Sequence, residues 1–210
     1  SKLITKGFTP LSVPNLVKER AMFGTGFFPA EKNEIYELQQ KEESLYLIGT
    51  AEVPLVNYHA DEILDLDQPK KYFAMTPAYR SEAGSYGKDM KGILRGHQFD
   101  KIEMVIFCKP EQSEELHQEI LAIEEEIWQD LKIPYQISNA CTGDLGIPAA
   151  KRYDIETWTP AQSKYREVTS CSSTTDFQSR RLNIKYKNAN KNEFCHTLNG
   201  TGMAFGRALV

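Results

Sequence analysis

Cysteine is scarce in this 210-residue chain and shows no pairing pattern. No two cysteines form a CxxC pair, and the four stand far apart, as Cys108, Cys141, Cys171 and Cys195. A small secreted domain would need a denser disulfide framework, so that class of protein is excluded. Reduced, structural thiols in a cytosolic protein are the favoured interpretation, while a zinc site stays open on the sequence alone.

Long apolar runs and an excess of positive charge are also missing. No stretch approaches the ~20 apolar residues of a membrane-spanning helix, and the N-terminus lacks the apolar segment of a signal peptide. The formal net charge of -4 disfavours a non-specific nucleic-acid binder, although it allows an enzyme that meets RNA through one local patch. We therefore expect no membrane contact and a cytoplasmic location.

Repeats, low-complexity tracts and clear interdomain linkers are absent from the sequence as well. Its composition, 40% hydrophobic and 26% charged, is ordinary for a globular domain with its own core. We expect one domain spanning residues 1–210. The first residue is not Met, which suggests that this domain belongs to a longer chain.

The most informative segment runs from residue 71 to residue 107. Two strand-like runs flank a loop, residues 81–96, whose four glycines predict mobility. Side chains repeat every two residues along a strand, so one face of the second run carries Phe99, Lys101, Glu103, Val105 and Phe107. Arg80 ends the first run and Arg95 ends the loop, which places two guanidinium groups on the same surface. A flat aromatic ring, two guanidinium groups and a carboxylate suit a nucleotide beside an amine-bearing substrate, although a plain surface hairpin is the alternative.

Upstream of this segment, the sequence predicts two short helices. Asn15 is a candidate N-cap for a helix from Leu16 to Phe23, which Gly24 would end. Thr50 precedes a Val-Pro-Leu helix start, and its spacing favours a second N-cap. The alternative is that Thr50 and Glu52 present a hydroxyl and a carboxylate to a cleft.

The clearest helix is predicted from Pro110 to Lys132. Its apolar residues recur at steps of three and four, as Leu116, Ile120, Ile123, Ile127 and Leu131. Acidic residues crowd its first turns, where the helix dipole favours negative charge. We expect the acidic face to be solvated, with His117 exposed on it and not bound to a metal.

The C-terminal third returns to strand-like runs, with a loop at residues 141–148 and a polar-tipped hairpin at residues 183–196. Glu167 and Ser170 bring oxygen atoms into one neighbourhood, which suits a hard cation such as Mg2+ that also holds phosphate oxygens. A polar edge strand is the alternative interpretation. Strands outnumber helices and pair through short turns, so the predicted fold class is α+β, an antiparallel β-sheet flanked by helices.

Glycines at positions 200, 202 and 206 fall one residue off the dinucleotide-binding fingerprint. No βαβ unit surrounds them, which excludes a Rossmann site. A strand that turns into a helix, with Arg207 on the first helical turn, fits the pattern better.

Five segments together resemble the class II aminoacyl-tRNA synthetases. Residues 79–84 (YRSEAG) with 95–99 (RGHQF) are similar to motif 2 of that class, and residues 199–207 (NGTGMAFGR) to motif 3. Three further segments resemble the seryl-tRNA synthetases in particular: residues 50–55 (TAEVPL), 99–103 (FDKIE) and 167–181 (EVTSCSSTTDFQSRR). Five motifs in the family's order, over nearly the whole chain, are highly specific.

This resemblance implies ATP-dependent activation of L-serine to seryl-adenylate and transfer of serine to the acceptor end of tRNA(Ser). It implies ATP as a substrate and Mg2+ as a cofactor, with no zinc expected. The implied serine-binding residues are Thr50, Ala51, Glu52, Arg80, Glu103, Asn199 and Thr201. The implied ATP-binding residues are Arg80, Ser81, Glu82, Arg95, Phe99, Glu167, Val168, Thr169, Ser170 and Arg207. Arg80 and Arg207 are the implied catalytic residues, and Glu167 and Ser170 match the metal ligands.

Three departures from the family pattern predict a catalytic-core fragment. The N-terminal coiled-coil arm that grips tRNA is absent, most of motif 1 with its dimer-forming helix is missing, and the chain stops just inside the motif 3 helix. Homodimerisation is expected for the full-length family. Two alternatives stay open: an amino acid:carrier-protein ligase, which depends on a zinc site, and a non-catalytic paralogue with a binding or regulatory role. Such paralogues typically lose the phosphate-binding arginines, whereas Arg80, Arg95 and Arg207 are all present.

Overall fold

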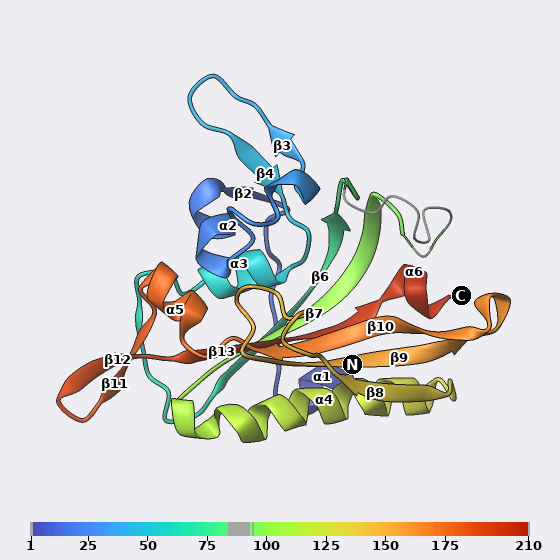
Figure 1. The fold of residues 1–210 in the computed structure, drawn as a ribbon. Coiled ribbons are helices and arrows are strands. Elements are labelled where there is room, and N and C mark those ends of the chain that lie inside the picture. The colour runs from blue at the N-terminus through green and yellow to red at the C-terminus, as the bar shows by residue number, and fades with distance from the viewer. Residues whose placement is uncertain (1, 84–92, 94, 210) are drawn as a thin grey trace.

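The computed structural model describes residues 2–83, 93 and 95–209, and a seven-stranded sheet is its centre (Figure 1). Across the sheet the strands are β1 (Thr9–Pro10), β6 (Lys70–Tyr79), β7 (Gln98–Cys108), β13 (His196–Ala204), β10 (Lys164–Ser173), β9 (Lys151–Thr159) and β8 (Tyr135–Asn139). The short β1–β6 pair is parallel, and the other neighbouring strands are antiparallel. The α+β prediction is therefore confirmed.

The helices and two smaller sheets surround this main sheet. The helices are α1 (Lys2–Thr5), α2 (Glu19–Thr25), α3 (Glu52–Asn57), α4 (Ser113–Asp130), α5 (Phe177–Leu182) and α6 (Phe205–Ala208). One small sheet holds β2 (Leu16–Lys18), β4 (Leu45–Leu47) and β3 (Glu37–Leu38), and the other holds β12 (Lys191–Phe194), β11 (Lys185–Asn188) and β5 (Ile63–Leu64). Short 3-10 turns occur at Lys32–Glu34, Pro110–Gln112 and Pro160–Gln162. None of the helices described is both long and apolar enough to cross a bilayer.

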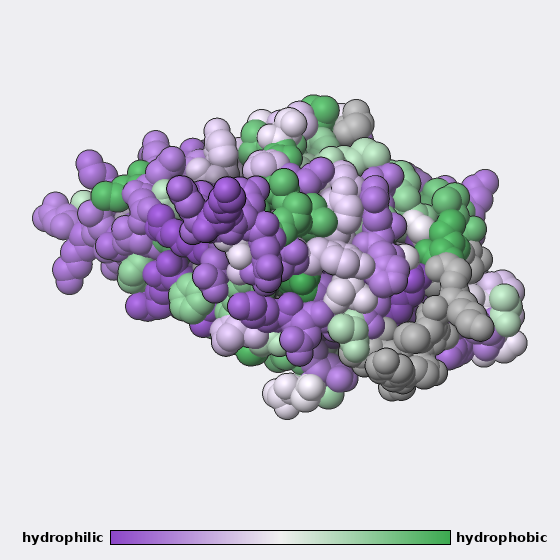
Figure 2. Space-filling view, turned by 90° about the horizontal axis from the view of Figure 1, so that it is seen from above, coloured by the Kyte–Doolittle hydropathy of each residue, from purple (hydrophilic) through white to green (hydrophobic). Residues whose placement is uncertain are grey.

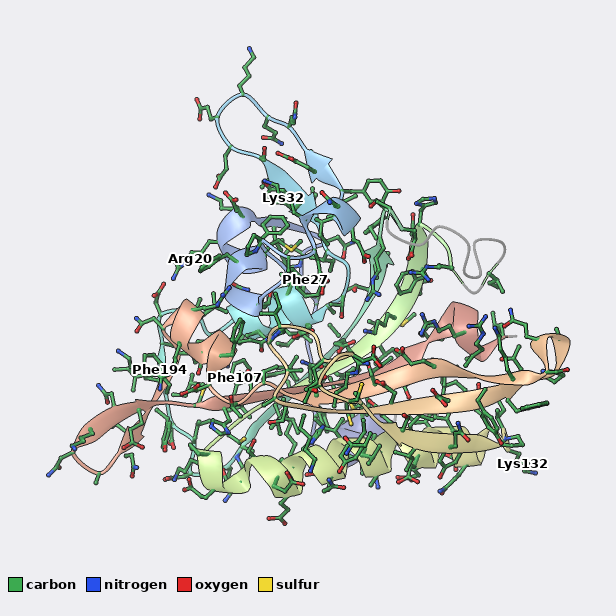
Figure 3. All side chains as sticks on the ribbon, viewed as in Figure 1. Arg20, Phe27, Lys32, Phe107, Lys132 and Phe194 are labelled. Carbon is green, nitrogen blue, oxygen red and sulfur yellow. The ribbon has the colours of Figure 1, made fainter. Side chains whose placement is uncertain are left out.

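Strand alternation divides the main sheet into two faces. Met104 and Ile106 of β7 pack with Ile120 and Ile123 of α4, which runs along one face. Side chains fill the layer between α4 and the sheet (Figure 3). Val105 and Phe107 point to the opposite face, where they join a second cluster with residues of α3 and α5. The face that carries Phe99 and Glu103 is therefore the face without α4, as the period of two predicts.

The first helix begins later than predicted. Residues 16–18 form β2, because they pair with β4 and show the alternating burial of a strand. The helix is α2, and Gly24 lies inside it, where a Cβ atom would be 2.2 Å from Leu182 Cδ2. Gly26, with a φ of 93°, ends the helix in the left-handed conformation. Gly24 is thus a close-packing glycine and not a stop signal.

Helix α4 confirms the predicted position, but His117 is not exposed. The His117 side chain is fully buried, stacks on the Tyr153 ring, and its Nε2 lies 3.1 Å from the Cys171 carbonyl oxygen. Burial lowers the pKa of His117. Glu124 on the same helix is also fully buried. The predicted acidic face is therefore only partly solvated, because α4 packs against β7, β13, β10 and β9 of the sheet along more of its circumference than its apolar stripe suggests.

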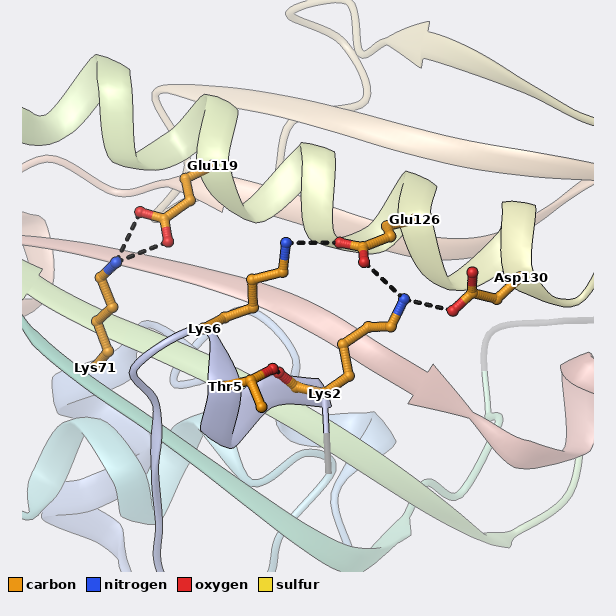
Figure 4. Close-up of polar contacts among 7 residues, drawn as sticks. All are labelled: Lys2, Thr5, Lys6, Lys71, Glu119, Glu126 and Asp130. Carbon is orange, nitrogen blue, oxygen red and sulfur yellow. Dashed lines mark hydrogen bonds and ion pairs between the residues drawn. The ribbon is translucent and has the colours of Figure 1, made fainter.

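Three further acids of α4 tie it to the N-terminal segment and to β6. Lys2 and Lys6 both pair with Glu126, at 2.9 and 2.7 Å, and Lys71 of β6 pairs with Glu119 at 2.7 Å (Figure 4). Exposed ion pairs of this kind stabilise a fold by about 0–1 kcal/mol each. They fix α1 against α4 and so position the edge strand β1.

The C-terminal predictions hold with adjusted boundaries. Strands β11 and β12 form the predicted hairpin. This hairpin lies at the left end of the molecule in Figure 1, and the same end is mainly hydrophilic in Figure 2. Strand β13 turns directly into α6, which carries Arg207. Strand β10 lies between β13 and β9, so the polar edge-strand interpretation of residues 167–170 is wrong.

Candidate functional site

A cavity of about 280 Å³ opens on the face of the main sheet opposite α4. Its walls come from β7, β10 and β13, from the ends of α2, β6 and β9, and from α3 and α6. Every site residue predicted from the sequence lines it except Ala51 and Ser81. The Ala51 side chain is fully buried in the core beneath the site. The Ser81 hydroxyl donates a 2.6 Å hydrogen bond to the Asn33 carbonyl oxygen.

Arg80 lies over the aromatic ring of Phe99. Its guanidinium carbon is 5.6 Å from the Phe99 ring centroid, within cation–π range, and its Nε donates to the Gly49 carbonyl oxygen at 3.3 Å. The backbone N–H of Arg80 donates to the carbonyl oxygen of His97 at 3.1 Å. That bond closes the base of the β6–β7 hairpin, which explains how two residues 19 positions apart share one surface.

Two further arginines line the same part of the cavity. Arg95 forms an ion pair with Glu82, whose backbone is in the left-handed region with a φ of 55°. Arg207 Nη1 donates to the Glu167 carbonyl oxygen at 2.8 Å and lies 3.6 Å from the Glu167 carboxylate. Most of the predicted loop that joins Arg80 to Arg95, residues 84–92 and 94, lies outside the described residues. Three guanidinium groups therefore converge on one end of the cavity.

Buried acidic groups line the other end. Glu52 is 9% exposed, and Gln178 Nε2 and Asn199 Nδ2 donate to its Oε1 at 2.7 and 3.0 Å. Burial, aided by the negative charge of Glu103, raises the pKa of Glu52 to about 7. Burial also raises the pKa of Glu103, which pairs with Lys101 at 2.7 Å. This end of the cavity can bind a small group that carries positive charge and hydrogen-bond donors.

Thr50 shows features of both predicted roles, the helix N-cap and the hydroxyl that faces a cleft. Helix α3 begins at Glu52, and Ala51 occupies the position immediately before it, so the predicted N-cap at Thr50 is one residue out of place. The Thr50 hydroxyl lies 3.4 Å from the Glu52 backbone nitrogen and 3.5 Å from Lys101 Nζ. Because Thr50 also lines the cavity, its hydroxyl is available to a ligand at the acidic end.

Comparison with known families decides what this cavity belongs to. Residues 35–210 match the tRNA synthetase class II core domain (G, H, P, S and T). The chain belongs to this family. Among curated relatives, it is 53% identical to the serine–tRNA ligase of Sulfurihydrogenibium over 97% of its own length and 49% of that protein, and 51% identical to that of Thermosipho melanesiensis over 97% and 48%. The chain therefore spans about half the length of the curated relatives it matches.

Solved structures agree with this class II assignment. The seryl-tRNA synthetase of Pyrococcus horikoshii, complexed with ATP, superimposes with a TM-score of 0.94 at 48% identity, over 99% of this chain and 47% of that one. The cytoplasmic serine–tRNA ligase of Naegleria fowleri, in complex with AMP, gives a TM-score of 0.92 at 37% identity, over 99% and 50%. The mixed sheet with flanking helices is therefore the class II synthetase catalytic fold.

A β-bulge brings the two predicted metal ligands of this class II core together. In a regular strand, residues 167 and 170 would point to opposite faces, because their separation is odd. The pairing of β10 with β9 shifts register between Glu167 and Thr169, so Val168 is the extra residue. Val168 packs in the core on the α4 side, and Trp128 of α4 donates to the Thr169 hydroxyl at 3.3 Å. Glu167 and Ser170 are left on the cavity side, while Val168 and Thr169 can offer it only backbone atoms.

Several lining residues of the class II core were missed by sequence reasoning. Lys101 could have been found, because it alternates with Phe99 and Glu103 on the predicted face. Other missed lining residues are Thr25, Gly26, Phe27, Glu31, Arg152, Ser172 and Thr174. No local pattern marks them, since α2, β9 and β10 meet only in the folded chain. Phe27 lies close to α2 and α3 (Figure 3).

The cysteines lie away from the cavity walls of the class II core. Cys108, Cys171 and Cys195 are buried and Cys141 is exposed, and all four are free thiols. The parts of the chain that the structure describes hold no group of three or more His, Cys, Asp or Glu side chains arranged to bind a metal ion. A zinc site of the usual four-ligand kind thus has no candidate there.

Proposed function

We propose that this chain forms seryl-adenylate from L-serine and ATP, and that the protein containing it transfers serine to the acceptor end of tRNA(Ser). One observation carries the proposal: a single cavity joins three arginines at one end to buried acids at the other. A triphosphate fits the first end, and an amino acid with an ammonium and a hydroxyl fits the second. The similarity to serine–tRNA ligases, and to seryl-tRNA synthetases bound to ATP and AMP, supports the same assignment.

The reaction needs charge stabilisation more than proton transfer. The serine carboxylate attacks the α-phosphorus, an O–P bond forms, the bond to the β-phosphate breaks, and pyrophosphate leaves. Because the attacking carboxylate is already ionised, no general base is required. Positioning of the two reactants and neutralisation of charge on the phosphates supply the catalysis.

The roles of the arginines are those that the resemblance to the synthetase family implies, and their place in the cavity is compatible with them. Arg80 holds the α-phosphate and the serine carboxylate, since its guanidinium group contacts both Phe99 and the carbonyl oxygen of Gly49, which precedes Thr50 of the acidic end. Phe99 and Arg207 sandwich the adenine base, while Glu82 accepts from the adenine amino group. Arg95 neutralises the γ-phosphate, and Arg207 shares that charge. Planar guanidinium groups suit this task because they donate two parallel hydrogen bonds to phosphate.

The cation is assigned to Glu167 and Ser170. The bulge in β10 presents a carboxylate and a hydroxyl oxygen on the cavity side, and Mg2+ prefers such hard oxygen donors. Two protein ligands are enough, because Mg2+ commonly takes its remaining ligands from substrate phosphates and water. When bound, the cation would neutralise phosphate charge. Arg207 and the backbone of Val168 and Thr169 would then orient the nucleotide beside it.

Serine selection is assigned to the acidic end. Thr50, Glu52, Glu103, Asn199 and Thr201 surround a space suited to the ammonium and hydroxyl of serine. A buried pocket built for a hydroxyl rejects alanine strongly, because its polar groups would stay unpaired. Threonine keeps the hydroxyl and must be excluded by size.

The proposal includes the context of the whole protein. Residues 1–210 form the catalytic domain, and the protein that contains it acts in the cytoplasm as a homodimer. These statements rest on the resemblance to the seryl-tRNA synthetase family, and the chain spans about half the length of its serine–tRNA ligase relatives. Gel filtration of that protein, and charging of tRNA(Ser) by it, test them directly.

The test of the proposed activity is ATP–pyrophosphate exchange with serine, threonine, alanine and glycine, each with and without added zinc. Exchange with serine alone, independent of zinc, is expected. Zinc-dependent exchange with glycine or alanine would instead identify an amino acid:carrier-protein ligase. Absence of exchange together with ATP binding in a titration would identify a non-catalytic paralogue.

A further inference from the structure

Gln178 connects four segments of the chain underneath the acidic end of the cavity. It lies on α5, is 1% exposed, and does not line the cavity. Its Nε2 donates to Glu52 Oε1 at 2.7 Å and to the Thr25 carbonyl oxygen at 3.2 Å. Its Oε1 accepts from the Thr197 hydroxyl at 2.8 Å. One buried amide thus ties together the ends of α2 and α3, helix α5 and strand β13.

The orientation of this amide is set by its surroundings. The Thr25 carbonyl oxygen can only accept a hydrogen bond, and an ionised Glu52 can only accept. On the other side, Thr197 Oγ1 lies 2.5 Å from Thr174 Oγ1, and Thr174 Oγ1 donates to the Thr197 carbonyl oxygen at 2.8 Å. Two hydroxyl donors thus lie within reach of Gln178 Oε1, Thr197 at 2.8 Å and Thr174 at 3.5 Å, and Thr197 is the nearer. The NH2 group faces Glu52, and a flipped amide would set two acceptors against each other.

The hydrogen bond from Gln178 helps to fix the orientation of the Glu52 carboxylate. Gln178 and Asn199 both reach Oε1, and within the described residues no hydrogen bond occupies Oε2. The carboxylate is therefore held with one oxygen anchored and the other left for a ligand in the cavity. We propose that Gln178 is a positioning residue for serine selection: it anchors Glu52 from behind, and Thr197 orients it. This inference rests on the proposed function, because it takes serine to be the ligand of Glu52.

The variant Gln178→Met tests the proposal, since it keeps the length of the side chain and removes the donor. Calorimetric titration with L-serine and with ATP, over a range of pH, is the measurement. We expect affinity for serine to fall at least about tenfold, because a hydrogen bond to a charged group is lost, and affinity for ATP to stay within about twofold. The pH midpoint of serine binding should move upward, because the lost hydrogen bond favours ionised Glu52. A merely structural role would not move that midpoint.

A second variant and a control keep the outcomes distinct. Thr197→Val removes only the hydroxyl that orients Gln178, and should weaken serine binding in the same direction by a smaller factor. Gln136→Met, at an exposed glutamine on β8, should leave all three readings unchanged. Unchanged serine affinity and pH midpoint in folded Gln178→Met, or in Thr197→Val if the former does not fold, would overturn the inference. If the unmodified chain fails to bind serine, the proposed function itself fails.

Discussion

Arg80 lies at the arginine end of the cavity, next to the acidic end. Its guanidinium group packs over Phe99 at the nucleotide end and, through Nε, meets the carbonyl oxygen of Gly49 next to the acidic end. Within the described residues this side chain makes one hydrogen bond and one cation–π contact, so its removal tests function more than stability. A single cation at this point can neutralise the α-phosphate and orient the attacking carboxylate together.

Arg80→Ala should therefore lose adenylate formation without unfolding. Removal of one preorganised hydrogen-bond donor that stabilises developing negative charge commonly lowers turnover by roughly 100- to 1,000-fold. Serine-dependent ATP–pyrophosphate exchange measures this loss, and the melting temperature should stay within a few degrees of the unmodified chain. Arg20→Ala, at an exposed arginine that pairs with Asp61, is the matched control. Retained exchange in Arg80→Ala would remove Arg80 from its assigned role.

Under the proposed function, Glu52 should make serine binding sensitive to pH near neutrality. Its pKa of about 7 means that the carboxyl is mostly protonated below that pH and ionised above it. Since an ionised carboxylate attracts the serine ammonium, the KM for serine should fall as pH rises through about 7. Glu52→Gln should abolish this dependence, and the KM for ATP should not follow it. A KM for serine that is flat between pH 6 and pH 8 would contradict the assignment.

The same group links stability to pH in the opposite sense. A carboxyl whose pKa is raised on folding stabilises the fold fully below its unfolded pKa, and that contribution is lost as pH rises through the folded pKa. For Glu52 the window runs from 4.5 to about 7. A pH above about 7 therefore favours serine binding but lowers the stability of the ligand-free fold. The ammonium group of bound serine offsets this loss of stability.

At the scale of elements, the contact between α4 and β13 depends on one glycine. Gly200 of β13 faces α4, and a Cβ atom there would lie 2.2 Å from Ile120 Cγ2 and 2.8 Å from Glu124 Oε1. The side chains of Ile120 and Glu124 consequently lie directly against the backbone of β13 at Gly200. The side chains of Asn199 and Thr201, on either side of Gly200, are held at the cavity by this contact.

Gly200→Ala should destabilise the chain by about 1–3 kcal/mol, because overpacking forces α4 away from the sheet. Chemical denaturation measures this change in the free energy of unfolding. Gly143→Ala is the matched control, since its Cβ would meet only Cys141 Sγ at 3.9 Å, and it should stay within about 0.5 kcal/mol. Equal stability of the Gly200→Ala variant and the unmodified chain would show that the helix can shift at no cost.

At the scale of the whole molecule, the cavity is assembled from segments at both ends of the chain. Thr25 follows the first strands and Arg207 lies in the last helix, yet both line it. A ligand that contacts all of these segments must stabilise the folded state relative to the unfolded state. The stability of the fold and the occupancy of the site are therefore linked.

ATP and serine together, each at about 100 times its dissociation constant, should raise the melting temperature by roughly 10–20 °C. This follows from about 2.7 kcal/mol of linkage for each ligand, about 5 kcal/mol for both, and about 2–4 °C per kcal/mol for a domain of this size. Differential scanning calorimetry measures the shift, and Arg80→Ala should show little of it. A shift produced by ATP alone, with no further effect of serine, would contradict a shared site.

Local patterns in the sequence determined the parts of the site that lie on regular elements. The period of two along β7 placed Phe99, Lys101 and Glu103 on one face, although no role in the site was assigned to Lys101, and the strand–helix turn placed Arg207. Motif resemblance then identified the family and the order of the site segments. These features depend on residues that are close together in the sequence. They can therefore be predicted without knowledge of the tertiary structure.

Only the tertiary structure decided the rest. The burial of His117 and Glu124, the bulge that turns Glu167 and Ser170 to one side, and the bond from Gln178 to Glu52 all join residues distant in sequence or shift the register of a strand. No periodic pattern encodes which faces of separate elements will meet. The sequence by itself determined which chemical groups the protein carries, and packing decided which of them hold the others in place.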